Sequence, residues 1–124
     1  MGERATIEIV DEMGEHSPAH IYVHWHGEHE AVCQFVKEAS TKMRKCSAEY
    51  AAARLVAHIC NSIDNNSDAL SVGLQQPSDN EQAAALLDHG HYIVNMGEGT
   101  VTQYSRWIPH GEVVRATSLE FYGG

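Results

Sequence analysis

Apolar and polar residues alternate in two short segments near the N-terminus, and a period of two predicts β-strands. The first segment spans residues 5–10 and the second spans residues 19–25. Since successive side chains of a strand point to opposite faces, the second segment has an apolar and a polar face. The apolar face carries Ile21, Val23 and Trp25, and the polar face carries His20, Tyr22, His24 and His26. Turn residues separate the two segments, so we expect these strands to form a hairpin.

The apolar period changes to that of a helix after Gly27. From Glu28 as far as Met43, apolar residues recur at i, i+3 and i+4, and basic residues lie near the end, as the helix dipole favours. Ser47 is a suitable N-cap for a second helix. The apolar stripe of this second helix consists of Ala52, Leu55, Val56, Ile59 and Ile63. The sequence therefore predicts two helices directly after the two strands.

The second half of the chain predicts further strands. They are expected at residues 69–74, 91–96, 100–104 and, as one or two strands, 112–122. Residues 97–99 have the composition of a hairpin turn, and residues 81–88 predict a short helix. The element order is then ββααβ(α)ββ(β). We expect residues 1–124 to form a single α+β domain, with one antiparallel sheet and two main helices packed on one face.

The composition excludes several classes of protein. Lys and Arg number 8 and Asp and Glu number 17, which gives a formal net charge of −9 with neutral histidines. This charge argues against general nucleic-acid binding and favours a protein partner with a basic surface. No apolar run approaches the roughly 20 residues of a membrane span, and residues 1–16 contain no apolar signal segment. The three cysteines lack CxxC spacing, so we expect reduced thiols and a cytoplasmic location.

Three sequence tracts and a hairpin follow one another along most of the chain. In order, they are residues 21–30 (IYVHWHGEHE), residues 48–55 (AEYAAARL), residues 70–74 (LSVGL) and the hairpin of residues 91–104. This pattern resembles a family of uncharacterised proteins of phages, prophages and plasmids, with the motifs HWxGxPE, AxYxAARL and LSxGL. The chain departs from the family pattern at His26 and at residues 28–29. The resemblance implies a mobile-element protein in a host bacterial cytoplasm, and it implies no activity.

Four of the nine histidines fall within residues 20–29. Residues 24–29 read HWHGEH, which is similar to the HxHxDH motif of metallo-β-lactamase-fold hydrolases. Histidines at i and i+2 share a strand face, and a third at the following turn could complete a zinc site. The candidate metal ligands are His24, His26 and His29, with further ligands available from His58, His89, His91 or His110. A chain of 124 residues is too short for the four layers of the metallo-β-lactamase fold, which argues against this hypothesis. In the alternative interpretation, these histidines form a polar sheet face that is either exposed to water or part of an interface.

Other chemistry-bearing features are few. The chain contains no GxSxG, P-loop or GxGxxG motif. Arg54 is interpreted either as a salt-bridge partner or as an anion-binding residue. The basic residues at the end of the first helix form either a solvated face or a local basic patch, and they are Lys37, Lys42, Arg44 and Lys45.

These features favour a small non-enzymatic binding protein from a phage or other mobile element. In this role it modulates or inhibits a host macromolecular complex, for example as an anti-CRISPR or other anti-defence protein. The alternatives are a small metal-dependent hydrolase using the HxHxEH cluster and a structural or virion-assembly accessory protein. The candidate binding residues are His20, Tyr22, His24, His26, His29 and Arg54. We expect no cofactor, with zinc at the histidines as the alternative. We also expect a homodimer or small oligomer whose interface partly buries the strand face of His20, Tyr22 and His24.

Overall fold

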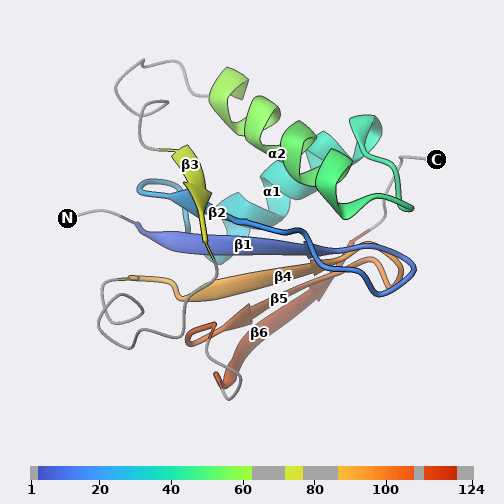
Figure 1. The fold of residues 1–124 in the computed structure, drawn as a ribbon. Helices are drawn as coiled ribbons and strands as arrows, with labels where there is room; N and C mark the ends of the chain where they lie inside the picture. Colours follow the sequence, from blue (N-terminus) through green and yellow to red (C-terminus); the bar gives the residue numbers. More distant parts are fainter. Residues whose placement is uncertain (1–2, 63–71, 77–86, 108–110, 120–124) are drawn as a thin grey trace.

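Two helices and a six-stranded sheet form the part of the chain that the computed structural model describes, namely residues 3–62, 72–76, 87–107 and 111–119. The strands are β1 (Ala5–Val10), β2 (His20–Val23), β3 (Val72–Gln75), β4 (His91–Asn95), β5 (Thr100–Tyr104) and β6 (Val113–Ser118). The helices are α1 (His29–Ala39) and α2 (Ala48–Ser62), with a short 3-10 helix, η1 (Ser40–Lys42), after α1. Both α-helices lie on the same side of the sheet (Figure 1). The predicted α+β class with two helices on one face is confirmed.

β1 lies inside the sheet, whose strand order is β3-β2-β1-β4-β5-β6. Four neighbouring pairs are antiparallel, including the predicted β1–β2 and β4–β5 hairpins. β1 and β4 instead pair in parallel, so the sheet is mostly rather than wholly antiparallel. β3 and β4 both run in the direction of β1. Side-chain alternation is the same for either strand direction, which is why the sequence pattern did not reveal the parallel pair.

The apolar core lies between the sheet and the helices. β1 is buried along its whole length. Ile7, Ile21 and Val94 from the sheet share one cluster with Val32 and Leu55 from the helices, and each is at most 1% exposed. Burial of one such side chain contributes about 2 kcal/mol. This cluster fixes the helices against one sheet face and leaves the other face available for polar groups.

Local sequence signals account for the start of α2. Ser47 caps this helix as predicted, because its Oγ accepts a hydrogen bond of 3.1 Å from the amide of Tyr50. The predicted apolar stripe of α2 packs into or against the core wherever it is described. Outside the described residues lie Ile63, residues 69–71 of the predicted third strand and residues 81–86 of the predicted short helix.

β2 ends at Val23, two residues before the end that the alternation predicts. Trp25, which we expected on the apolar face, lies beyond the strand and is only partly buried. The chain turns there because His26 has a left-handed backbone with a φ of 65°. The amide of Gly27 then donates a hydrogen bond of 2.9 Å to the carbonyl of Glu3. A Cβ at residue 27 would lie 2.2 Å from that carbonyl oxygen, so the close approach requires glycine.

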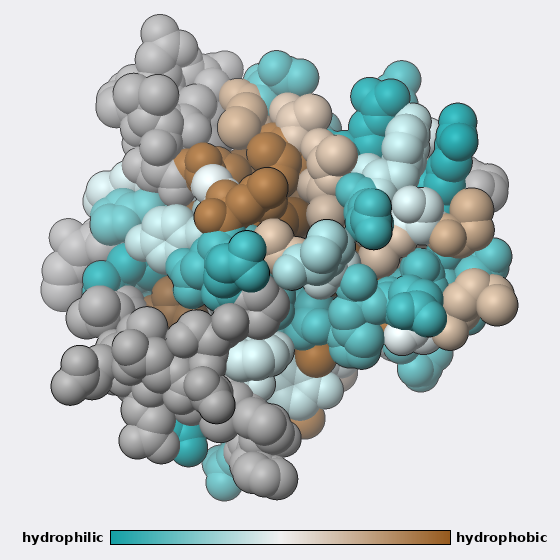
Figure 2. All heavy atoms as spheres, in the orientation of Figure 1, coloured by the Kyte–Doolittle hydropathy of each residue, from teal (hydrophilic) through white to brown (hydrophobic). Residues whose placement is uncertain are grey.

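An apolar groove lies on the surface where α2 meets the edge strand β3 (Figure 2). Ala52, Ala53, Val56 and Leu74 are among the residues that line it. Leu74 is 68% exposed. At this edge, the apolar side of the sheet therefore reaches the surface.

The substitution Gly27→Ala should destabilise the fold by about 1–3 kcal/mol, because the added methyl group overlaps the backbone of Glu3. Urea unfolding measures the change. Gly73→Ala is the matched control, since a Cβ at residue 73 meets nothing within 4 Å. We expect the control to change the free energy of unfolding by less than about 0.5 kcal/mol. Equal stability of the two variants would contradict this account of the turn.

Candidate metal centre

Polar side chains gather at the middle of the sheet, on the face opposite the helices. Glu8 belongs to β1, with His20 on the neighbouring strand β2 and His91 on the other neighbour, β4. The parallel register places His91 opposite Thr6, which shares a sheet face with Glu8. Although neither α1 nor α2 covers this face, Glu8, His20 and His91 are only 6%, 3% and 1% exposed. Three ionisable side chains are therefore buried together, which is rare unless they are paired or bind a metal ion.

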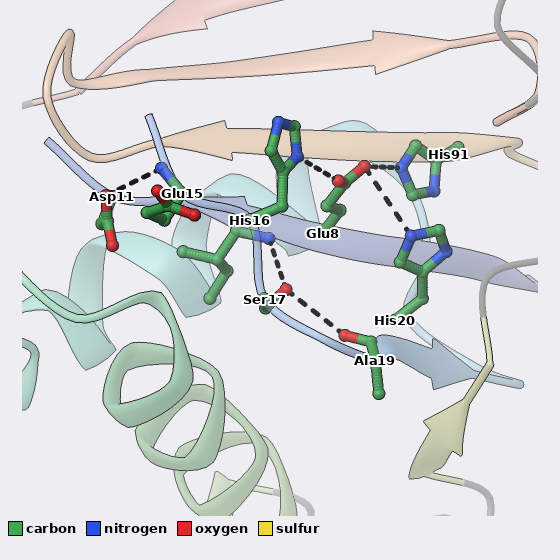
Figure 3. Close-up of polar contacts among 9 residues, drawn as sticks. Glu8, Asp11, Glu15, His16, Ser17, Ala19, His20 and His91 are labelled. Atoms are coloured by element: carbon green, nitrogen blue, oxygen red, sulfur yellow. Dashed lines mark hydrogen bonds and ion pairs between the residues drawn. The ribbon is translucent and has the colours of Figure 1, made fainter. Parts of the chain in front are cut away.

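One carboxylate oxygen of Glu8 faces both imidazoles (Figure 3). Oε1 of Glu8 lies 3.0 Å from Nε2 of His91 and 3.7 Å from Nε2 of His20. The ring centroids of the two histidines are 4.6 Å apart. One potential ligand atom from each residue lies within 4.8 Å of the other two, and no other group of three such residues occurs in the described parts of the chain.

The other polar atoms of these residues have partners of their own. Nδ1 of His91 lies 2.7 Å from Oγ1 of Thr6. The second carboxylate oxygen of Glu8 is hydrogen-bonded to Nδ1 of His16, a more exposed residue of the β1–β2 connection. Across the described residues, no buried side-chain nitrogen or oxygen lacks a partner. Thr6 thus orients His91, and His16 orients Glu8. In these orientations, Nε2 of His91 and Oε1 of Glu8 face each other.

Trp107 packs over the two histidines from the connection between β5 and β6. Its ring meets His20 edge-on with centroids 5.1 Å apart, and its centroid is 6.5 Å from that of His91. A hydrogen bond of 2.8 Å from the amide of Ser105 to the carbonyl of Glu112 closes the base of this connection. A cavity of about 470 Å³ opens beside the cluster. Glu8, His16, His91, Tyr104, Arg106 and Trp107 are among the residues that line it.

Burial and neighbouring groups set the protonation of the cluster. Burial raises the pKa of Glu8, but hydrogen bonds with His91 and His16 outweigh burial and hold this pKa at about 2. Burial and the nearby His91 lower the pKa of His20 to about 4. Near pH 7, Glu8 is therefore ionised and His20 is neutral. These are the forms in which a carboxylate and an imidazole bind a metal ion.

Two of the three separations among the donor atoms, those measured from Glu8, are close to the separations in a zinc site. Ligands about 2.0–2.1 Å from zinc in a tetrahedron lie about 3.3 Å from one another. The two separations measured from Oε1 of Glu8, 3.0 and 3.7 Å, lie on either side of that value. Catalytic zinc sites have three protein ligands and leave the fourth position to water or substrate. Two histidines and a glutamate beside a cavity therefore form a candidate catalytic metal centre.

The residues of the HxHxEH string do not come together in this structure. The hydroxyl of Tyr22 lies 3.1 Å from Nδ1 of His24, and the ring of His26 packs against Phe35. His24, His26 and His29 form no group of potential metal ligands within the described residues. The reason is that β2 ends at Val23, so the i, i+2 alternation does not continue to His26. Of the predicted binding residues, His20 alone belongs to the cluster around Glu8.

His29 and Arg54 lie in other environments. His29 is buried on the helix side of the sheet, with Nδ1 3.1 Å from Gln103 and Nε2 2.7 Å from Thr117. Its hydrogen-bond partners are an amide and a hydroxyl, which explains its burial without a metal ion. The guanidinium of Arg54 donates a hydrogen bond of 2.9 Å to the hydroxyl of Tyr50, one turn earlier on α2.

Of the histidines considered as additional ligands, His91 does belong to the cluster. His58 and His89 pair with Glu38 and Glu3, and His110 lies outside the described residues. Sequence reasoning missed Glu8 and Thr6 as site residues. The signal available for Glu8 was an acidic residue in the middle of a mainly apolar strand. That signal has a clear meaning only when the strand is known to be buried on both faces.

Comparisons with family models, with curated proteins and with solved structures found no match to this chain. The resemblance to mobile-element proteins therefore stays a prediction. No helix among the described residues is both long enough and apolar enough to cross a membrane.

The stability of the metal-free protein should fall as the pH drops from 7 to 5. The pKa of His20 is about 4 in the folded protein and near 6.5 without the fold, so the unfolded chain binds more protons in this range. For this residue, the linkage amounts to about 2 kcal/mol between pH 7 and pH 5. Urea unfolding in the presence of a chelator measures the loss. His20→Gln should have a smaller pH dependence, and a flat wild-type profile from pH 7 to 5 would contradict the buried, neutral state of His20.

Proposed function

We propose that this protein is a small zinc-dependent hydrolase whose metal ion is bound by Glu8, His20 and His91. One observation carries the proposal. Three buried donor atoms from three neighbouring strands converge within 4.8 Å of one another, and two of the three residues, Glu8 and His91, line a cavity. Strands of one sheet hold such side chains more rigidly than loops do, which favours a defined coordination geometry.

The donor set supports zinc. Two imidazole nitrogens and one carboxylate oxygen are ligands that zinc accepts, and three protein ligands leave one position for water. Zinc bound by these residues would lower the pKa of a coordinated water to about 7 and would supply a hydroxide nucleophile at neutral pH. The adjoining cavity supplies space for a substrate next to Glu8 and His91.

The partners of the ligands support the same conclusion. Histidines that bind metals usually donate their other ring N–H to an oxygen, and this bond fixes the tautomer. Oγ1 of Thr6, 2.7 Å from Nδ1 of His91, can accept that hydrogen and leave the lone pair of Nε2 for the metal. His16 holds the carboxylate oxygen of Glu8 that faces away from the two histidines. Thr6 and His16 are therefore positioning residues for the proposed centre.

A metal-dependent hydrolase was one alternative from the sequence, with His24, His26 and His29 as its candidate ligands. The ligands proposed here are Glu8, His20 and His91 instead. The binding or anti-defence role and the virion-assembly role remain predictions that depend on the resemblance and on the net charge. The homodimer also remains a prediction, but one reason for it is weaker. His20 is 3% exposed within the single chain and does not need a partner subunit for its burial.

The wild-type protein, freed of metal with a chelator, should bind one Zn²⁺ per chain in isothermal titration calorimetry. Glu8→Gln and His91→Gln each change one of the three ligands, so each should weaken this binding by more than the roughly 10- to 100-fold that loss of a ligand's hydrogen-bond partner costs. Co²⁺ bound in place of zinc should show the visible absorption of a tetrahedral site. His24→Gln is the matched control, since His24 lies outside the proposed ligand set and bonds to Tyr22.

Circular dichroism of each variant separates loss of the site from loss of the fold. Folded Glu8→Gln and His91→Gln variants that bind zinc as tightly as the wild type would overturn the proposed function. The same conclusion would follow if His24→Gln abolished binding and the other two variants did not.

A further inference from the structure

The cavity beside the proposed zinc centre has a cationic residue, Arg106, in its lining. Arg106 is the one Lys or Arg among the described residues that line the cavity, and it lies two residues after the end of β5. We propose that this cavity binds a phosphate ester and that Arg106 holds its phosphoryl group, an inference that rests on the proposed zinc centre.

The charge of the cavity supports an anionic substrate. The protein as a whole carries a formal net charge of −9, which repels anions at long range. With zinc bound, the cavity would be lined by a divalent cation and by Arg106, against the carboxylate of Glu8. The cavity is then locally positive on an acidic protein. An anion that enters is stabilised there more than elsewhere on the surface.

A phosphoryl group matches two cations better than a carboxylate does. The planar guanidinium donates two parallel hydrogen bonds to a pair of phosphoryl oxygens, and a further oxygen is available to the metal ion. A carboxylate has only two oxygens, so it cannot give two oxygens to the guanidinium and a third to the metal ion. Arginine also has five N–H donors, more than the two that a pair of phosphoryl oxygens accepts.

The remaining walls indicate the organic part of the ester. Ile93, Tyr104 and Trp107 line the cavity, and two of these three side chains are aromatic. The volume of about 470 Å³ is within the usual range of small-molecule sites. An ester of an aromatic or heterocyclic alcohol therefore fits better than a small alkyl phosphate.

The position of Arg106 is fixed by a close contact inside the β5–β6 connection. A Cβ at Gly111 would lie 2.0 Å from the carbonyl oxygen of Arg106 and 3.0 Å from its carbonyl carbon. The two arms of the connection therefore touch at these residues, and the contact requires glycine. Because Trp107 is the next residue, the same contact helps to place its ring against His20.

The reaction is hydrolysis and needs no further reagent. A water molecule activated by the metal would form a bond from its oxygen to phosphorus as the bond from phosphorus to the ester oxygen breaks. The alcohol leaves with one proton, and the phosphate product keeps the oxygen supplied by water. No atom is oxidised or reduced.

The first test measures phosphate binding by the zinc-loaded full chain. Inorganic phosphate should bind to the wild type, and Arg106→Gln should weaken that affinity by about 10- to 100-fold without changing zinc affinity. Gly111→Ala should also weaken it, because the guanidinium is kept but displaced. Arg115→Gln is the matched control and should bind phosphate normally, since Arg115 pairs with Glu30 of α1.

The second test compares three chromogenic esters with one leaving group. p-Nitrophenyl phosphate is a monoester, bis(p-nitrophenyl) phosphate is a diester, and p-nitrophenyl acetate is neutral. We expect zinc-dependent hydrolysis of at least one phosphate ester, and Arg106→Gln should raise its KM by about 10-fold or more. If Arg106→Gln does not fold, Arg106→Lys keeps the charge without the paired donors and should raise KM by a smaller factor.

The outcomes distinguish the two proposals. If zinc binds and the neutral ester is hydrolysed while both phosphate esters are inert, the phosphate inference is overturned and the hydrolase proposal stands. Phosphate binding or phosphate-ester KM values that are unchanged in Arg106→Gln also overturn the inference. If zinc does not bind through Glu8, His20 and His91, the hydrolase proposal fails and the phosphate inference fails with it.

Discussion

The ionised carboxylate of Glu8, buried inside the sheet, is the constraint on which the rest of this structure depends. An unpaired carboxylate in such a place would cost several kcal/mol. The fold meets this cost by bringing His91 to within 3.0 Å on one side and by placing His20 and His16 on the others. The parallel pairing of β1 with β4 is part of the same solution, because it brings His91 next to Glu8. Three histidines, His16, His20 and His91, therefore surround the buried carboxylate of Glu8.

Histidines around a buried carboxylate either only neutralise the charge of that carboxylate or join it in binding a metal ion. The buried His29 is a useful comparison, since it is paired with neutral groups and is fully accounted for as a packing feature. The cluster around Glu8 differs in three ways. It contains an anionic donor, its two histidines converge on one side of that donor, and it borders a cavity. These differences are why we place the chemistry on the open face of the sheet and not at the HxHxEH string.

Local patterns were sufficient to predict most of the secondary structure. The alternation in residues 5–10 and 100–104 and the cap at Ser47 act over a few residues, and the structure confirms them. Pairing between distant strands was not accessible in this way. Glu8 and His91 are far apart in sequence, and no local signal shows that their strands run side by side in parallel. The same limit explains why a dense run of histidines attracted attention, although its strand ends at Val23.

The most direct test of the account is a crystal structure of the zinc-soaked protein with anomalous diffraction data collected at the zinc absorption edge. We expect one strong anomalous peak per chain, about 2.0–2.2 Å from a carboxylate oxygen of Glu8 and from Nε2 of both His20 and His91. Nδ1 of His91 should still contact Thr6 in that structure. A peak at His24 or His29 would contradict the account. A structure with no anomalous peak near Glu8, in which Glu8 is still hydrogen-bonded directly to His91, would also contradict the proposed zinc site.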